Sequence, residues 1–549
     1  MIQELSEPTK SLIKKYEFWQ RSLQPKQGVS TIHVDEVALR VAAFYEQIRT
    51  IVDWKEEHLM RRAAIIRKLK RRFLDFELNN FSEVEGAGES LVLELIRGGH
   101  FPNDKIEESK IKDVQEIINK YIFILKNSAG WRTDNKKGNP PAGGGLQFYN
   151  WILEVCSCEI EETLYPPMRE NALIDYMFEL MKERVKVNES IYKLNLLEKE
   201  DKDIQIYIAI QQALFKLDRP IISYNLLKYK YQEWEKPDEN FLLKISQNAY
   251  KIWSKIEEDL SCPIAKKFYT ICEKYDTPYL LLGDILSQKN LQNIEKEIEN
   301  PAVLEGLIKS AYKKRATDLK NKIWRAAIYS TVSIFLTKIL TLVVLEVFLS
   351  ELLTGRFNAV VLIFDVLIPT VLMFGLVASV KPPSEKNLNL VILEAMKIVY
   401  KKESMDVYEV KTQKKRSVAT RTVISLIYTV SAFLSFGFIY WAFRFFGFPI
   451  TSIIVNVIFI ALILFAGTAV RKRAEELTVE DENEGFLSFL SDVFFLPIQG
   501  LGKWLSSKWK KYNAIAAFFN AMIDMPFSVF VEFIERWRYF IKERKEEMH

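Results

Sequence analysis

The sequence predicts an all-α membrane protein, with a large helical cytoplasmic domain, four transmembrane helices in two hairpins, and amphipathic interfacial helices near the C-terminus. Three observations support this prediction. Long, nearly uncharged runs lie between positions 326 and 470, whereas the preceding residues are polar and rich in charge. Apolar residues before position 320 recur with helical spacing. Few stretches alternate like β-strands, so an α/β enzyme fold is not expected.

Four runs reach the length of about 20 residues that a helix needs to cross a hydrocarbon core of about 30 Å. Each is rich in Leu, Ile, Val and Phe, and Gly or Pro occur where membrane helices tolerate them. The four runs are 326–350, 357–380, 422–446 and 448–470.

Basic residues predict the orientation of these runs. Seven Lys or Arg residues lie between positions 309 and 325, ten between 381 and 421, and three directly after 470. The opposite ends carry only Arg356 and, inside the third run, Arg444. Because cationic loops remain in the cytoplasm, both termini and the middle loop are expected on the inner side of the plasma membrane.

The spans and the Gly- and Pro-rich stretch before them divide the chain into segments. The expected order is an N-terminal helical unit (1–127), a linker (128–145), a second helical unit (146–300), a helix leading into the membrane (303–325), the first hairpin (326–380), a basic cytoplasmic loop (381–421), the second hairpin (422–470) and a cytoplasmic tail with interfacial helices (471–549).

Two charged residues fall deep inside the first hairpin. Lys338 lies eleven residues from the outer end of its run and Asp365 eight from the outer end of the next, so their depths differ by about 4–5 Å. An ion pair between neighbouring antiparallel helices would offset the desolvation of both charges. The pair either fixes the register of the hairpin or belongs to an ion or proton pathway. Glu346 and Arg444 are close enough to the outer interface to reach water.

A basic amphipathic helix is expected around position 66. Its apolar face contains Ala63, Ile66 and Leu69. Its cations face either water, as part of a helical bundle, or anionic lipid; nucleic acid is not expected. The cations are Arg61, Arg62, Arg67, Lys68, Lys70, Arg71 and Arg72.

The C-terminal region could contain a fifth span at 514–534, but Asp524, Pro526 and Glu532 interrupt it. Aromatic residues interleaved with cations favour helices that lie at the headgroup level. The preceding segment, 485–500, is too short to span and fits the surface or a packed re-entrant helix. The expected interfacial anchors are Trp504, Trp509, Tyr512, Trp537 and Tyr539.

No residue pattern predicts catalysis, a metal site or a cofactor. Cys156 and Cys158 lack the spacing of a zinc knuckle, and the four cysteines of the chain are expected to be reduced and mostly buried. The carboxylates nearby favour a charged, solvated helix over general acid–base chemistry. These carboxylates belong to Glu154, Glu159, Glu161, Glu162 and Glu170.

These observations favour a non-enzymatic membrane scaffold that recruits a cytoplasmic protein and contacts membrane lipids. The alternative is a subunit of an oligomeric channel or transporter that uses Lys338 and Asp365, with a homo-oligomer supplying the pore.

Overall fold

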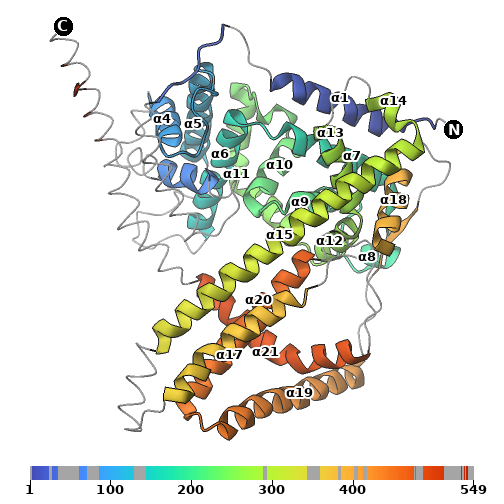
Figure 1. The fold of residues 1–549 in the computed structure, drawn as a ribbon. Coiled ribbons are helices and arrows are strands. Elements are labelled where there is room, and N and C mark those ends of the chain that lie inside the picture. Colours follow the sequence, from blue (N-terminus) through green and yellow to red (C-terminus); the bar gives the residue numbers. More distant parts are fainter. Residues whose placement is uncertain are drawn as a thin grey trace. The chain divides into compact units, whose positions relative to one another are not determined.

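The computed structural model describes most of the chain, and the described part is predominantly helical, which confirms the all-α prediction (Figure 1). The described residues are 3–23, 28–34, 61–70, 86–128, 144–288, 294–342, 359–380, 385–400, 406–411, 417–474, 477, 486–511 and, singly, 533, 537, 540, 541 and 544. They form two compact units: unit 1 contains Met1–Lys10, Lys274–Met405 and Lys411–Asn513, and unit 2 contains Ser11–Glu273, Asp406–Val410 and Ala514–His549.

Unit 2 is a helical bundle with one small parallel sheet. Strand β1 (Val185–Val187) pairs with β2 (Tyr408–Val410), so the chain returns to this unit after leaving it for unit 1. Most of α1 (Glu7–Ser22) belongs to the same unit. Its further helices are α4 (Ala87–Arg97), α5 (Ser109–Asn127), α6 (Gly144–Leu164), α7 (Met168–Arg184), α8 (Glu189–Lys193), α9 (Lys202–Phe215), α10 (Arg219–Lys230), η2 (Gln232–Trp234), α11 (Glu239–Leu260) and α12 (Ala265–Lys274).

Side-chain caps define where several of these helices begin. Asp238 accepts a hydrogen bond from the Phe241 amide at 2.6 Å at the start of α11, and Asn188 accepts one from Ser190 before α8. Such caps satisfy amide groups that have no partner inside the helix. These helix starts are therefore set by local sequence.

Helix α6 lies in the core of unit 2 rather than on its surface. Cys156, Ile160 and Ser157 are fully buried, and Glu159 and Glu161 are buried with them. The expectation of a charged, solvated helix is therefore wrong. One hydrophobic cluster includes buried residues from both sides of the expected linker, of which positions 129–143 lie outside the described residues.

The polar part of unit 1 packs four helices around one another. They are α13 (Asp276–Gln288), α14 (Ile294–Ile298), the first half of α15 (Pro301–Thr341) and α18 (Glu385–Val399). Helix α18 lies within the segment expected to be a basic loop, and it buries Val391, Ala395 and Ile398 on one face. This amphipathic face is the physical reason why the segment folds.

Within the described residues, three helices are long and apolar enough to cross a membrane: the C-terminal part of α15, α19 (Val418–Phe445) and most of α20 (Ile450–Ala474). Helix α17 (Ala359–Ala378) has a described apolar stretch, Ile363–Ala378, that is shorter than a full span. The protein therefore has the helices of a membrane protein, while the count of four crossings stays a prediction.

A tight turn joins α19 to α20. Gly447 adopts φ +77°, which glycine reaches without steric cost, and its amide donates to the Arg444 carbonyl at 3.0 Å. The Phe448 amide donates to Phe443, and the two rings pack edge to face with centroids 4.9 Å apart. The turn therefore fixes α19 and α20 as a hairpin.

Helix α21 (Phe486–Lys511) extends beyond the short segment 485–500 expected from the sequence, and it packs on α19 and α20 (Figure 1). Pro497 inside it cannot donate to the Val493 carbonyl, one turn earlier. Ser431 of α19 replaces that donor, because its hydroxyl lies 2.5 Å from the Val493 oxygen. These contacts lie near the middle of α19. A helix held only at the headgroup level would instead contact the end of a spanning helix.

Substitution of Gly502 tests how closely α21 approaches α20. A Cβ atom at this position would lie 2.0 Å from the Ala461 carbonyl oxygen, so Gly502→Ala must separate the two helices. We expect the purified full-length variant in nanodiscs to lose several degrees of thermal stability, whereas Gly437→Ala in α19, where a Cβ atom meets nothing within 4 Å, should not. Equal melting temperatures for the two variants would contradict this packing.

Candidate functional site

The residues that sequence analysis singled out inside the apolar region meet in the structure. Lys338 Nζ of α15 lies 2.6 Å from Asp365 Oδ2 of α17, and both side chains are completely buried. Helices α15 and α17 pack side by side, so the pair spans their interface (Figure 1). Two opposite charges at this distance in a poorly polarisable interior attract strongly, which offsets the cost of removing both from water.

Asn456 of α20 adds a third helix to this site, which we call the polar cluster (Lys338, Asp365 and Asn456). Its amide nitrogen donates to Asp365 Oδ1 and to the Ser452 carbonyl, the latter at 2.9 Å. The side chain of Asn456 is completely buried, and that of Ser452 is nearly so. The carboxylate of Asp365 therefore connects α15 to α20 through its two oxygens.

The apolar surroundings of the polar cluster contribute as well. The Lys338 ammonium lies 5.2 Å from the centre of the Phe459 ring, within range of a cation–π interaction. Pro369 follows Asp365 by four residues and cannot donate the helical hydrogen bond to its carbonyl. Asn456 Oδ1 is buried and accepts no hydrogen bond from the described residues.

The other charges expected near the membrane are placed differently. Arg444 is exposed near the C-terminal end of α19, and Glu346 lies outside the described residues. Trp504 is 56% exposed on α21 and Trp537 is 55% exposed. The Trp509 side chain, Tyr512, Tyr539 and nearly all of 514–534 lie outside the described residues, so interfacial anchoring by them stays a prediction.

The expected basic helix is present at 61–70, but much of its charge faces the protein. Arg62 is 2% exposed and lies 2.7 Å from Asp218, and Arg61 lies 3.2 Å from Glu161. Lys68 pairs with Glu94 at 2.9 Å. Arg67 is half-buried and Lys70 is exposed, whereas Arg71 and Arg72 lie outside the described residues. Contact of this helix with lipid therefore stays a prediction.

The buried side differs from the apolar face that the sequence suggested for this helix. Ala64, Ile65 and Leu69 are buried, whereas Ala63 and Ile66 are half-buried. The helix turns this side inward because Arg62 is buried beside Asp218. Tertiary ion pairs thus override the simple apolar pattern.

A second buried network in unit 2 was missed by sequence reasoning. Lys120 pairs with Glu159 and donates to the Trp234 carbonyl at 3.0 Å, and the Tyr121 hydroxyl donates to Glu159 at 2.7 Å. The Trp234 indole donates in turn to Tyr121 at 3.3 Å. Residues 39 positions apart in sequence are paired here, which no local spacing could reveal. The network is closed by its own partners and joins α5, α6 and η2.

The buried thiols next to this network are poor nucleophiles. Burial raises the pKa of Cys158 to about 12, although Arg62 opposes the shift, and burial raises the pKa of Cys156 well above its usual value. Burial also raises the pKa of Glu154 and Glu161. Both thiols are thus protonated at neutral pH, and thiolate chemistry is not supported at this site. In the described part of the chain, no three His, Cys, Asp or Glu side chains gather as metal ligands do.

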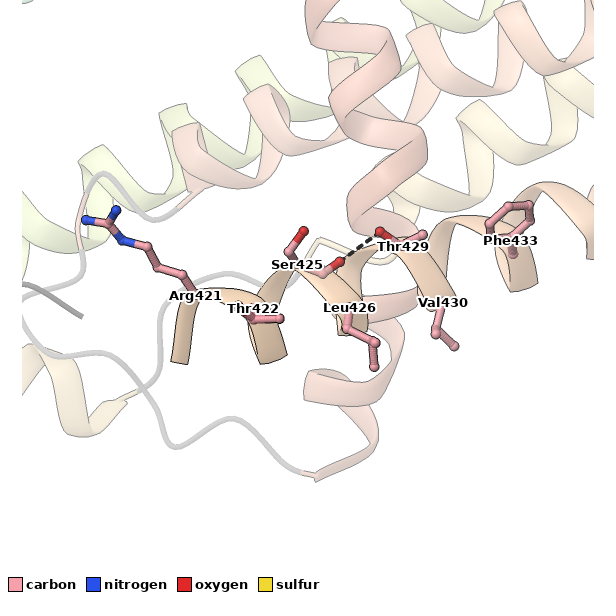
Figure 2. A pocket seen from close by; sticks show the side chains of 7 residues that line it. All are labelled: Arg421, Thr422, Ser425, Leu426, Thr429, Val430 and Phe433. Atoms are coloured by element: carbon pink, nitrogen blue, oxygen red, sulfur yellow. Dashed lines mark hydrogen bonds between the residues drawn. The ribbon is translucent and has the colours of Figure 1, made fainter. Parts of the chain in front are cut away.

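An open depression lies along α19, outside the polar cluster (Figure 2). Its polar wall is made by Arg421, Thr422, Ser425 and Thr429, and its apolar wall by Leu426, Val430 and Phe433. All seven residues belong to one helix, and their side chains are exposed. Ser425 and Leu426 point in opposite directions (Figure 2), so the seven side chains form an open helix surface and not an enclosed site.

Comparison of the chain with protein-family models, curated proteins and solved structures finds no match. The function is therefore argued from the residues and their geometry.

Replacement of the buried ion pair by leucine tests whether it stabilises the helix bundle. Lys338→Leu or Asp365→Leu alone leaves one buried charge without its partner, so each should lower the free energy of unfolding by about 3–5 kcal/mol. The double variant removes both charges and should lie close to wild type, apart from the lost bond to Asn456. Equilibrium unfolding of the full-length protein in bicelles measures all three.

The double-mutant cycle decides the outcome. A double variant as unstable as the sum of the two single variants would show that Lys338 and Asp365 act independently, and would contradict the pairing.

Proposed function

We propose that this protein is a non-enzymatic, multi-pass scaffold of the plasma membrane, whose helical unit 2 recruits a protein partner on the cytoplasmic side. The observation that carries the proposal is the polar cluster: its Lys338 and Asp365 side chains have no exposure to water and are held by three helices. Such a cluster favours a fixed bundle over an open conduit.

The continuity of α15 supports the same role. This helix of 41 residues begins at Pro301, directly after Asn300, whose side chain accepts a hydrogen bond from the Ala302 amide at 3.1 Å. It packs on α13 and α18 before its apolar part reaches Lys338. A long helix without an internal proline or other break curves only gently, so its two ends keep a nearly constant distance and direction. The polar part of unit 1 is thus tied to the apolar bundle.

This arrangement and the distribution of charge support four crossings. Helix α17 is joined to α15 and α20 by the polar cluster, so we infer that it crosses the bilayer with them although its described apolar stretch is short. The basic residues at 309–325, 381–421 and 471–473 then lie together in the cytoplasm.

Site-specific cross-linking in living cells tests recruitment. A photoreactive amino acid replaces Phe18 or Leu194, which are 66% and 59% exposed in unit 2, and Phe433, which is 78% exposed on α19, serves as the membrane control. We expect at least one of the two unit 2 positions to yield a reproducible adduct with one protein and Phe433 to yield none. Absence of any protein adduct at both unit 2 positions would contradict recruitment through these surfaces.

A second candidate function is that of an ion- or proton-conducting subunit in an oligomer. One oxygen atom favours it: Asn456 Oδ1 is buried and accepts no hydrogen bond from the described residues. Polar groups of this kind at membrane depth often border a pathway.

Flux through reconstituted liposomes discriminates this candidate from the scaffold. A conducting subunit predicts sodium or proton flux in wild type that disappears in the stable Lys338→Leu/Asp365→Leu double variant, and Ser431→Ala on α19 controls for an altered bundle. Wild-type liposomes no leakier than protein-free ones would exclude conduction by the chain alone.

A further inference from the structure

Helix α21 contacts the middle of two helices for which we propose a membrane crossing. The Ser431 hydroxyl, which bonds the Val493 carbonyl, lies 13 residues from the start of α19 and 14 from its end. Gly502 packs against Ala461, which lies 11 residues from each end of the apolar span Ile450–Lys472 of α20. The part of α21 between these contacts therefore passes from the middle of α19 to the middle of α20.

The end of α21 that follows Gly502 is polar and exposed. Lys503, Ser507 and Lys508 are exposed, and Trp504 is 56% exposed among them. Neither lysine forms an ion pair with a residue that the structure describes. Lys503 follows Gly502 directly, and Lys508 lies about 9 Å further along the helix. Half of a hydrocarbon core measures about 15 Å, so the backbone at both lysines lies at the depth of the hydrocarbon.

A polar surface connects this part of α21 with the first turn of α19. A Cβ atom on Gly500 would lie 3.1 Å from the Tyr428 hydroxyl oxygen, so Tyr428 contacts α21 three residues before Lys503. Arg421 and Ser425 precede Tyr428 by seven and three residues and share its side of α19. Both point to the same side of the helix in Figure 2. The side of α19 that meets α21 thus offers polar groups from its first turn to near its middle.

Charge and depth identify what such a surface holds in a bilayer. An ammonium group is costly in hydrocarbon, and a membrane relieves this cost by bending headgroups and water toward it. We propose that the C-terminal part of α21 and the Tyr428 side of α19 hold phospholipid headgroups near the middle of the bilayer, and that the protein thereby speeds the transfer of phospholipid between the two leaflets. The inference rests on the proposed crossings of α19 and α20 and is independent of partner recruitment.

Transfer becomes faster because the headgroup has less hydrocarbon to cross. The barrier is the loss of hydration of a charged phosphate in an apolar medium. Where headgroups reach the middle of the bilayer, the hydrocarbon that remains falls from about 30 Å to about 15 Å. The Lys503 ammonium attracts the phosphate. The Ser507 hydroxyl donates to the Trp504 carbonyl at 2.7 Å, so its oxygen accepts a hydrogen bond from the water that accompanies the headgroup.

The reactivity of introduced cysteines tests whether water reaches α21. Ser507→Cys in the full-length protein should react with a hydrophilic maleimide in inverted membrane vesicles, because a thiol forms its reactive thiolate in contact with water. Mass spectrometry of the modified peptide identifies the site. Leu462→Cys is the matched control, because Leu462 is 37% exposed on α20 next to Ala461, and it should stay unreactive in hydrocarbon.

The two failures of this experiment differ. A Ser507→Cys variant as unreactive as Leu462→Cys would overturn the proposal and leave the crossings intact. Reaction at both positions would contradict the crossing of α20, and the proposal with it.

Transfer of fluorescent phosphatidylglycerol in liposomes measures the activity itself. Dithionite, which does not cross the bilayer, bleaches the outer leaflet of protein-free liposomes, whereas with wild-type protein the inner lipid should be bleached as well. Lys503→Leu should slow this transfer about fivefold, which corresponds to about 1 kcal/mol, the contribution of one lysine near a membrane surface.

Lys472→Leu is the matched control for charge. Lys472 is exposed at the end of the apolar span of α20, outside the polar surface, so its replacement should leave the transfer rate unchanged. Wild-type liposomes bleached no further than protein-free ones, or equal slowing by Lys503→Leu and Lys472→Leu, would overturn the proposal.

Discussion

The ion pair between Lys338 and Asp365 is the interaction on which the apolar helix bundle of unit 1 depends. Each charge alone would be costly in hydrocarbon, and each is acceptable because the other lies 2.6 Å away. Asn456 extends the pair to a third helix, so α15, α17 and α20 share one polar centre. Apolar surfaces pack with little preference for register in lipid, whereas a buried charge pair permits only one alignment. We infer that the cluster aligns the helices of this bundle.

The same principle appears at α21 and in unit 2. Pro497 leaves a carbonyl without its donor, and Ser431 of α19 supplies the missing hydrogen bond. In unit 2, Glu159 is buried because Lys120 and Tyr121 satisfy both of its oxygens. In each case a polar group that would be costly alone is satisfied by a partner on another helix. Polar contacts therefore specify the packing, while apolar burial supplies most of the stabilisation.

The parts of this structure that follow local rules could be predicted from the sequence. Helical character follows from spacing, and the pairing of Lys338 with Asp365 follows from counting depth along a hairpin. The contact of Asn456 with this pair could not be predicted in this way, because Asn456 is uncharged and lies in the other hairpin. Depth along one helix does not define its register with a helix that is distant in the sequence. The burial of Glu159 depends on partners 38 and 39 residues away.

Strand β2 has only three residues and pairs with β1 more than two hundred positions earlier, so it has no periodic signal. Helix α18 did leave a signal, the spacing of Val391, Ala395 and Ile398, which the basic residues around it obscured.

The central claim is that the apolar helices cross the bilayer and leave unit 2 in the cytoplasm. Single cysteines introduced at Phe446, which is 68% exposed at the turn between α19 and α20, and at Leu194 in unit 2 test it directly. A membrane-impermeant maleimide added to intact cells should label position 446, and should label position 194 only after the cells are permeabilised. Labelling of position 194 in intact cells, or of 446 only after permeabilisation, would contradict the account.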